Sequence, residues 1–238
     1  MTKSVLNFDS LAATELQHEP FDWAFANRLY TAEDAEVLAR TYPVDHYKSV
    51  ARLSGGEKSY TYEARPLIHI DSTDVAFEDH LSDTWRQLAR DLASPAYRTA
   101  MSRLTGLDLS TAPMEAYVCH FGPGAWLGPH ADLKTKILTH VFYFNSEWRA
   151  EDGGCLHVLR TKNEDDKVDT VLPLVGNSSI IMRSDTSWHS VSKVESGATE
   201  SRRSMNVIFY NGDQPSSMWP DGETPSFHDY PPPAVAAE

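Results

Sequence analysis

Cysteine and long hydrophobic runs are what this sequence most clearly lacks. Only two of its 238 residues are cysteine, Cys119 and Cys155, so we predict no disulfide framework and a reducing compartment. No stretch approaches the ~18 consecutive apolar residues of a membrane span, and the opening residues MTKSVLNFD lack the apolar core of a signal peptide. We therefore expect a cytoplasmic protein that is neither secreted nor inserted in a membrane.

Basic residues are also few relative to acidic ones. The chain has 21 lysines and arginines against 34 aspartates and glutamates, a formal net charge of −13. Such a surface repels polyanions, which excludes a general binder of nucleic acid or of acidic membranes. We expect the partner to be a small-molecule substrate, and a homodimer is compatible with these features.

The composition is that of a globular protein, with 41% hydrophobic and 11% aromatic residues. The length suits one domain with a full core. We predict a single domain over residues 1–238, divided into a mainly helical part (1–112), a β-rich core (113–213) and a proline-rich tail (214–238), which is too polar and too rich in proline to pack as a regular element.

Three helices are predicted in the first part. Thr31 is a good N-cap for a helix that ends before Pro43, and Ser94-Pro95 begins another that ends at Gly106. Between them, apolar residues recur at helical spacing over residues 78–92. The segment 50–70 contains Gly55-Gly56 followed by aromatic and charged residues. It is either a lid that contributes substrate contacts or an ordinary surface hairpin.

From Pro113 onward the apolar residues recur with a period of two. Several short strands separated by glycine and proline, without helices between them, indicate a sandwich or jelly roll that carries the helices on its outside. The predicted strands are Met114–Phe121, Ile137–Asn145, Cys155–Leu159, Val168–Leu174, Ser179–Arg183 and Met205–Asn211.

The motif His130-Ala131-Asp132 is the clearest sign of chemistry in the chain. Alternate residues of a strand point to the same face, so His130 and Asp132 can project together, ~6.6 Å apart along one strand. His189 lies 57 residues beyond Asp132, far enough for the chain to cross several strands and return. Two histidines and one carboxylate are the protein ligands of a facial Fe(II) site with open coordination positions.

A basic pair follows the second histidine, in the run Arg202-Arg203-Ser204. A guanidinium can bind a carboxylate through two hydrogen bonds and stays charged at any working pH. If Arg202 and Ser204 face inward, both can bind the carboxylate of a dicarboxylic cosubstrate, and Arg203 faces outward; the opposite orientation remains open. Tyr143 either donates a further hydrogen bond to that cosubstrate or is simply a core aromatic.

From about Met114 to Asp213 the chain resembles the Fe(II)/2-oxoglutarate-dependent dioxygenases, in particular their prolyl-hydroxylase-like branch. The resemblance rests on the order of motifs. They are His130-Ala131-Asp132, then Phe142-Tyr143-Phe144-Asn145, then Asp152-Gly153-Gly154-Cys155-Leu156, then His189, and last the basic pair that opens the final strand.

The resemblance implies a double-stranded β-helix, a jelly roll of the cupin type, flanked by N-terminal helices. It makes His130, Asp132 and His189 the iron ligands and Arg202, with Tyr143, the binding site of the cosubstrate carboxylate. The cofactors implied are Fe(II), 2-oxoglutarate and O₂, with ascorbate as reductant. The family often has a tyrosine on the strand before the HxD pair; here Phe121 takes that place, which affects one expected 2-oxoglutarate contact.

The expected reaction converts 2-oxoglutarate to succinate and CO₂ while an unactivated C–H bond is oxidised. Asp132 is present where related halogenases have a small residue, so we predict hydroxylation or desaturation. The expected substrate is a small molecule such as an amino acid or its derivative, and the alternative is a prolyl or other residue within a protein. A cupin-like metal-binding module without turnover is a third reading, but it has no need of the basic pair. No HExxH run or zinc-type cysteine pair occurs.

Overall fold

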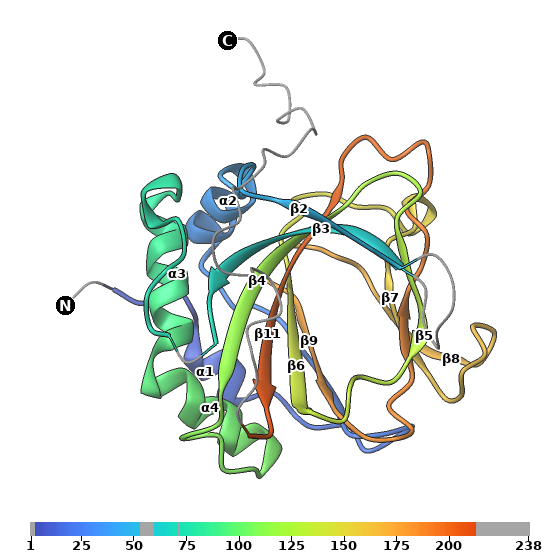
Figure 1. Cartoon of the computed structure of the whole chain (residues 1–238), viewed down its shortest axis with the longest axis horizontal. Helices are drawn as coiled ribbons and strands as arrows, with labels where there is room; N and C mark the ends of the chain where they lie inside the picture. Colours follow the sequence, from blue (N-terminus) through green and yellow to red (C-terminus); the bar gives the residue numbers. More distant parts are fainter. Residues whose placement is uncertain (1–2, 53–59, 71, 213–238) are drawn as a thin grey trace.

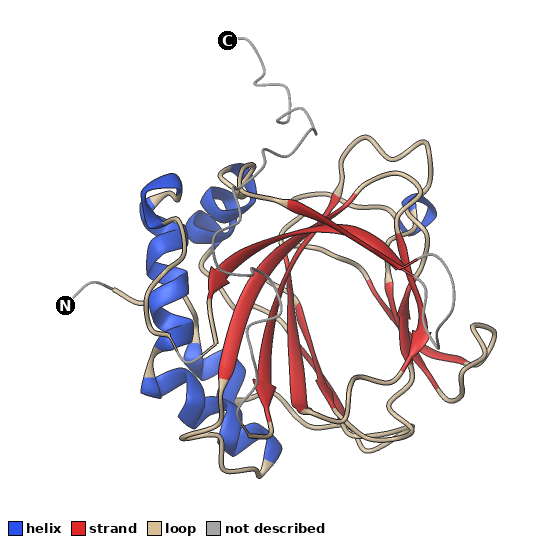
Figure 2. Ribbon diagram, in the orientation of Figure 1, coloured by secondary structure: helices blue, strands red, loops and turns tan. Residues whose placement is uncertain are grey.

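The computed structural model describes residues 3–52, 60–70 and 72–212. A curved antiparallel sheet folds back on itself, and a layer of helices covers one of its outer faces (Figure 1). The same view coloured by element shows that the helices gather on that side, apart from a short 3-10 turn on the other (Figure 2). Among the described residues, no helix has both the length and the hydropathy needed to cross a membrane.

The sheet runs in the order β1-β9-β6-β11-β4-β3-β5-β10-β7-β8, with β2 paired to β3, and every pairing is antiparallel. The strands are β1 (Trp23–Ala26), β2 (Lys48–Arg52), β3 (Tyr60–Ile68), β4 (Met114–Phe121), β5 (Trp126–His130), β6 (Lys136–Tyr143), β7 (Leu156–Leu159), β8 (Lys167–Val171), β9 (Ser178–Met182), β10 (His189–Val191) and β11 (Arg202–Tyr210). Consecutive strands repeatedly fall in different parts of the sheet, as in a jelly roll.

The six predicted strands are all present, and β4 has the predicted bounds. β5 and β10 were missed because Gly128 and Pro129 weaken the strand signal in one and the other has only three residues. The prediction that His130 and Asp132 share a strand is wrong in detail. β5 ends at His130, and Asp132 lies in the connection to β6.

The helices are α1 (Phe8–Ala12), α2 (Ala32–Arg40), α3 (Asp83–Ala93) and α4 (Pro95–Thr105), with 3-10 turns at Glu78–His80 and Ala150–Asp152. Thr31 and Ser94 cap α2 and α4 through their side chains, as predicted. The helix predicted over residues 78–92 begins later, because the hydroxyl of Ser82 accepts the backbone N–H of Trp85 and starts α3 at Asp83. Gly106 ends α4 with φ of 72°, a left-handed conformation that glycine adopts without strain.

The expectation of a mainly helical first part is incomplete, because β1, β2 and β3 lie within residues 1–112. In β3, Glu63, Arg65 and Pro66 break the alternation of apolar and polar residues that marks a strand. Residues 50–52 and 60–70 of the predicted lid belong largely to β2 and β3, which form a hairpin. The Gly55-Gly56 turn and the proline-rich tail over residues 214–238 lie outside the described residues.

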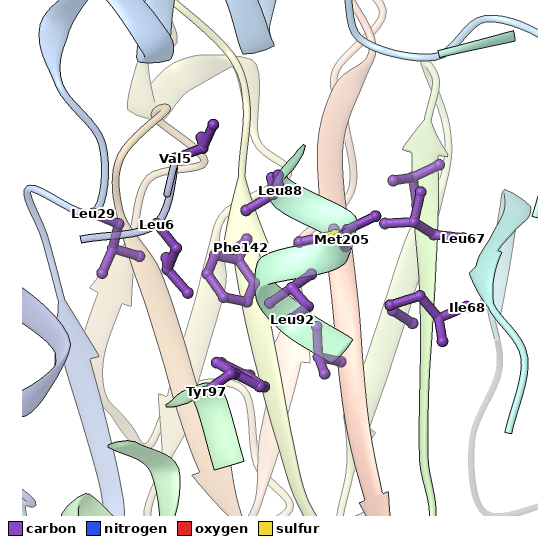
Figure 3. Packing of buried hydrophobic residues seen from close by; sticks show 14 of the residues in the cluster. Val5, Leu6, Leu29, Leu67, Ile68, Leu88, Leu92, Tyr97, Phe142 and Met205 are labelled. Carbon is purple, nitrogen blue, oxygen red and sulfur yellow. The ribbon is translucent and has the colours of Figure 1, made fainter. Parts of the chain in front are cut away.

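The largest hydrophobic core lies between the helices and the sheet. Figure 3 shows part of it: Leu88 and Leu92 of α3 and Tyr97 of α4 lie near Phe142 of β6 and Met205 of β11. Two smaller clusters, around Cys119 with Ile208 and around Val158 with Ile181, lie inside the sheet's own curve. The helical layer therefore supports the outer face of the sheet and leaves the inner face for the site.

Tyr42, just beyond α2, ties the helical layer to the sheet. Its hydroxyl oxygen lies 2.8 Å from the carbonyl oxygen of Cys119 on β4 and 2.6 Å from that of Ser204 on β11, and it accepts the N–H of Cys119 at 3.1 Å. Cys119 and Ser204 are paired across the two strands. The guanidinium of Arg203 donates a hydrogen bond to the carbonyl of Ala39 in α2, at 3.2 Å. Helix α2 is thus attached to the strand that begins with Arg202.

His140 on β6 is a fully buried histidine between the two layers. Its Nδ1 lies 2.8 Å from the hydroxyl of Tyr97 and its Nε2 lies 2.8 Å from the hydroxyl of Ser178. Burial lowers the pKa of His140 to about 3, because the charged imidazolium would lose its hydration. The imidazole is therefore neutral in the folded protein.

This histidine should make the fold sensitive to acid. Its pKa is lower in the folded state than the ~6.5 of an unfolded chain, so its contribution is fully present above pH 6.5 and is lost as the pH falls toward 3. Between pH 7 and pH 5 the expected loss of unfolding free energy from this group is about 2 kcal/mol. Urea unfolding at the two pH values should show a smaller loss for His140→Gln, and equal losses in both proteins would contradict the assignment.

Candidate active site

Three potential metal ligands meet at one end of the sheet's inner face. His130 comes from the end of β5, Asp132 from the connection to β6, and His189 from the start of β10, where it is paired with His130. One donor atom from each lies within 4.8 Å of the others, and all three residues are buried. The spacing and the donor types fit the facial site that the sequence predicts, although Asp132 reaches it from a turn and not from a strand.

Both histidines are held in the tautomer that metal binding needs. The Nδ1 atom of His130 lies 2.9 Å from the carbonyl oxygen of Gly128, and that of His189 lies 2.9 Å from the carbonyl oxygen of Ser187. Since a carbonyl only accepts, each Nδ1 carries the proton and each Nε2 is left with its lone pair. The two rings lie 4.2 Å apart, centroid to centroid.

The carboxylate of Asp132 is fixed by two side chains of β6. Lys136 donates to Oδ1 at 2.8 Å and Thr139 donates to Oδ2 at 2.7 Å. Burial alone would raise the pKa of Asp132, but the charge of Lys136 and the positions of His189 and His130 hold it well below its usual range. The carboxylate is therefore anionic at neutral pH. Neither partner is predicted by the sequence motifs, although Thr139 shares the inward face of β6 with Val141 and Tyr143.

A cavity of about 270 Å³ opens from this triad and extends along the inner face of β11. Arg202 is almost fully buried at 1% exposure, yet it lines this cavity together with Ser204. The other lining residues include four aromatics, Tyr62, Tyr117, Phe121 and Tyr210, and the polar Asn206. The strand period places Asn206 on the same face as Arg202 and Ser204, a signal that could have identified it from sequence.

The guanidinium of Arg202 is held in place, but not all of its N–H groups have an acceptor among the described residues. Its Nε donates to the carbonyl of Gly154 at 2.6 Å and its Nη1 donates to the hydroxyl of Ser204 at 2.7 Å. It lies over the rings of Phe121, at 4.9 Å, and Tyr143, at 5.4 Å. No residue in the described part of the chain accepts a hydrogen bond from Nη2. One edge of this cation is therefore available to an anion in the cavity.

The neighbouring residues divide between the two faces of β11. Arg203 points to the helical layer, where its Nη2 lies 3.7 Å from Glu200 and its Nη1 bonds to Ala39, so the orientation with Arg202 inward is the observed one. Tyr143 does not line the cavity. Its hydroxyl lies 2.9 Å from that of Ser179 and its ring contacts Arg202, and burial raises its pKa to about 12. A direct hydrogen bond from Tyr143 to a cosubstrate stays a prediction.

Gly153 and Gly154 allow the chain to pass beside this arginine. A Cβ on Gly153 would lie 1.9 Å from the backbone oxygen of Lys193, and one on Gly154 would lie 3.2 Å from Cδ of Arg202. Both glycines have positive φ, 70° and 63°, a conformation that other residues adopt at a cost. The glycine pair of the Asp152-Gly153-Gly154 motif therefore allows the chain to place the Gly154 carbonyl where Arg202 donates a hydrogen bond to it.

A comparison with family models decides what this arrangement is. Residues 115–210, which include the triad and Arg202, match the model described as the 2OG-Fe(II) oxygenase superfamily. The chain carries a 2OG-Fe(II) oxygenase domain. It is therefore an enzyme of the oxidoreductase class whose family uses Fe(II), 2-oxoglutarate and O₂. A search of curated proteins finds no match to the chain.

Three solved structures share the fold of this chain. A Pseudomonas putida prolyl-4-hydroxylase has a TM-score of 0.54 at 18% identity, covering 87% of this chain and 97% of that one. A Trichoplax adhaerens prolyl hydroxylase, solved with a hypoxia inducible factor peptide, has 0.52 at 15%, with 79% and 83% covered. The epimerase SnoN of nogalamycin biosynthesis has 0.51 at 17%, with 86% and 80% covered. The predicted double-stranded β-helix is thus confirmed.

Proposed function

We propose that this oxygenase hydroxylates an unactivated C–H bond of a small molecule, with an amino acid or its derivative as the substrate class. The observation that carries the proposal is that one buried cavity holds both the His130, Asp132 and His189 donors and the open edge of Arg202. A metal site alone would not need that cation, whereas a keto diacid has a carboxylate to offer it.

The residues in and around the cavity have separate tasks. His130, Asp132 and His189 would hold Fe(II), which supplies the activation of O₂ that no amino-acid side chain can provide. Arg202 and Ser204 would bind and orient the far carboxylate of 2-oxoglutarate, and the rings of Tyr143 and Phe121, which both contact the guanidinium, would help to hold it in place. Lys136 and Thr139 would keep the Asp132 carboxylate ionised and in one orientation.

The cavity favours a small substrate. Its volume of about 270 Å³ is near the lower end of ligand pockets, ~300–1,000 Å³, and 2-oxoglutarate would share it. The rings of Tyr62, Tyr117 and Tyr210 in its lining suit a compact group with apolar surface. The alternative substrate is a prolyl or other residue of a peptide, which is suggested by the Trichoplax adhaerens structure with its bound peptide.

Two further features belong to this proposal. Both cysteines are buried free thiols in the structure, which supports a reducing compartment such as the cytoplasm. We expect ascorbate to support turnover by returning the metal to its ferrous form.

A succinate-release screen tests the proposal. The full chain with Fe(II), 2-oxoglutarate and ascorbate would be supplied with free amino acids, their acylated or carrier-linked forms, and proline-containing peptides. We expect succinate above the uncoupled background with a member of the first two groups. A response confined to peptides would transfer the function to the alternative, and oxidation of no substrate together with no 2-oxoglutarate binding would contradict the enzyme assignment.

A further inference from the structure

A second group of metal-binding side chains lies away from the active-site cavity. Asp45 and His46 belong to the connection between α2 and β2, and His80 belongs to the 3-10 turn before α3. A donor atom of each lies within 4.8 Å of the others. Asp45 and His46 are mostly buried, with side chains 14% and 11% exposed, whereas that of His80 is 49% exposed.

The cluster lies on the helical side of the sheet, behind β3. Arg65, fully buried on β3, contacts it, whereas Tyr62 of the same strand lines the active-site cavity. Residues three apart in a strand point to opposite faces. The cluster and the triad of His130, Asp132 and His189 are therefore on opposite sides of one sheet, and they cannot share an ion.

The imidazoles surround the two oxygens of one carboxylate. The Nδ1 atom of His46 lies 3.0 Å from Oδ1 of Asp45, and the Nδ1 atom of His80 lies 2.8 Å from Oδ2. Within the described residues, neither the contact from His46 nor that from Arg65 Nε, at 3.5 Å, gives the buried Oδ1 atom a hydrogen bond of good geometry. Burial would raise the pKa of Asp45, but His46 and Arg65 hold it below its usual range, so the carboxylate is charged at neutral pH.

The backbone around the cluster is held in an uncommon conformation. His46 has φ of 62° and Phe77 has φ of 53°, both left-handed, and their rings are stacked with centroids 4.0 Å apart. A non-glycine residue in this region costs free energy and persists only where its surroundings require it, frequently at a binding site. Here the conformation directs His46 toward Asp45 and His80, with the two imidazoles 4.4 Å apart.

We propose that Asp45, His46 and His80 form a second metal site, for a borderline divalent cation such as Zn²⁺ or Co²⁺. Two imidazoles and a carboxylate are ligands that such ions accept, and the exposed side of His80 leaves room for water as a fourth ligand. Without a metal, Nδ1 of His80 carries the proton, because the Asp45 carboxylate 2.8 Å away only accepts. Binding through Nδ1 would therefore move that proton to Nε2. For His80 that nitrogen belongs to a half-exposed ring, so the proton can be hydrated.

Arg65 sets the strength of the site. Its Nε lies 3.5 Å from Oδ1 of Asp45, while its Nη atoms bond to the carbonyls of Pro66 and Phe77, at 3.0 and 3.2 Å. A fixed guanidinium beside the carboxylate opposes a second cation. We therefore expect this site to be weaker than the triad. Its ion would join the loop after α2 to the turn before α3, and would stabilise the structure by linkage.

Counting bound Co²⁺ tests the proposal without any assay of turnover. Chelator-treated full chain would be dialysed against Co²⁺ alone, and bound metal measured per chain. We expect two equivalents for wild type and one each for His80→Ala and His130→Ala. His18→Ala is the matched control, because His18 makes an exposed pair with Asp22, 2.8 Å apart, that belongs to neither cluster, so two equivalents should remain.

Thermal unfolding gives a second readout. In the His130→Ala background, Zn²⁺ should raise the Tm, and adding His80→Ala should remove that shift. One equivalent of Co²⁺ in wild type, or two in His80→Ala, would show that Asp45 serves only an ion-pair network. If His130→Ala bound no Co²⁺ while His80→Ala still bound one equivalent, the bound metal would belong to the active site. The cluster of Asp45, His46 and His80 would then hold none.

Discussion

His130→Ala is expected to abolish the complex of this oxygenase with Fe(II) and 2-oxoglutarate. The variant removes one of three buried donors that lie within 4.8 Å of each other. Loss of an outer hydrogen-bond partner alone costs ~10–100-fold in metal affinity or activity, so loss of a ligand should exceed about 100-fold. Anaerobic addition of Fe(II) and 2-oxoglutarate should give the weak visible charge-transfer band of a chelated keto acid in wild type and no band in the variant.

The band is a better readout than total metal, because the second cluster could still hold an ion in His130→Ala. His157→Ala is a suitable control. His157 is a buried histidine on β7, 3.4 Å from Glu164, and it does not line the cavity. The band should survive in that protein. Persistence of the band in His130→Ala would remove His130 from the iron site and with it the basis of the proposed function.

Arg202→Ala is expected to raise the apparent KM for 2-oxoglutarate by roughly 10- to 100-fold. Hydrogen bonds to a charged group contribute ~1.5–3 kcal/mol, and each 1.4 kcal/mol is about tenfold in affinity. The variant leaves the carbonyl of Gly154 and the hydroxyl of Ser204 without their donor, so its Tm should also fall. Steady-state succinate formation at varied 2-oxoglutarate measures the effect.

Arg203→Ala is the matched control for this prediction. The two arginines are adjacent, but Arg203 faces α2 and bonds to the carbonyl of Ala39. The variant should lose stability while its 2-oxoglutarate requirement stays near that of wild type. A large rise in KM for Arg203→Ala, with little change for Arg202→Ala, would assign the cosubstrate carboxylate to the other residue.

The parts that could be predicted from sequence are those governed by local periodicity. The alternation in residues 114–121 gives the bounds of β4, and Thr31 and Ser94 begin the helices they cap. The HxD motif and a distant histidine predict that His130, Asp132 and His189 lie together, and the structure brings their donor atoms within 4.8 Å of one another. The same period of two correctly separates Arg202 and Ser204 from Arg203.

What could not be predicted depends on contacts between distant residues. β3 pairs with β4 from Glu63 to Ile68, and that pairing, not the mixed sequence of β3 itself, makes Glu63, Arg65 and Pro66 part of a strand. Asp132 lies beyond the end of β5, where Lys136 and Thr139 donate hydrogen bonds to its carboxylate. Asp45 and His46 come from the connection between α2 and β2, and His80 comes from the 3-10 turn before α3, so no spacing in the sequence predicts that they lie together.

The hydroxyl of Tyr42 reaches two paired strands at once, which has a consequence for how this oxygenase could change during evolution. Substitutions in α2 that shift Tyr42 would move the backbone at Cys119 and Ser204. The position of Arg202 would then change as well, although none of the substituted residues lines the cavity. The affinity for the cosubstrate could thus change through substitutions in a helix on the far side of the sheet. Selection for altered turnover should therefore yield substitutions near residues 39–42 as readily as substitutions in the lining of the cavity.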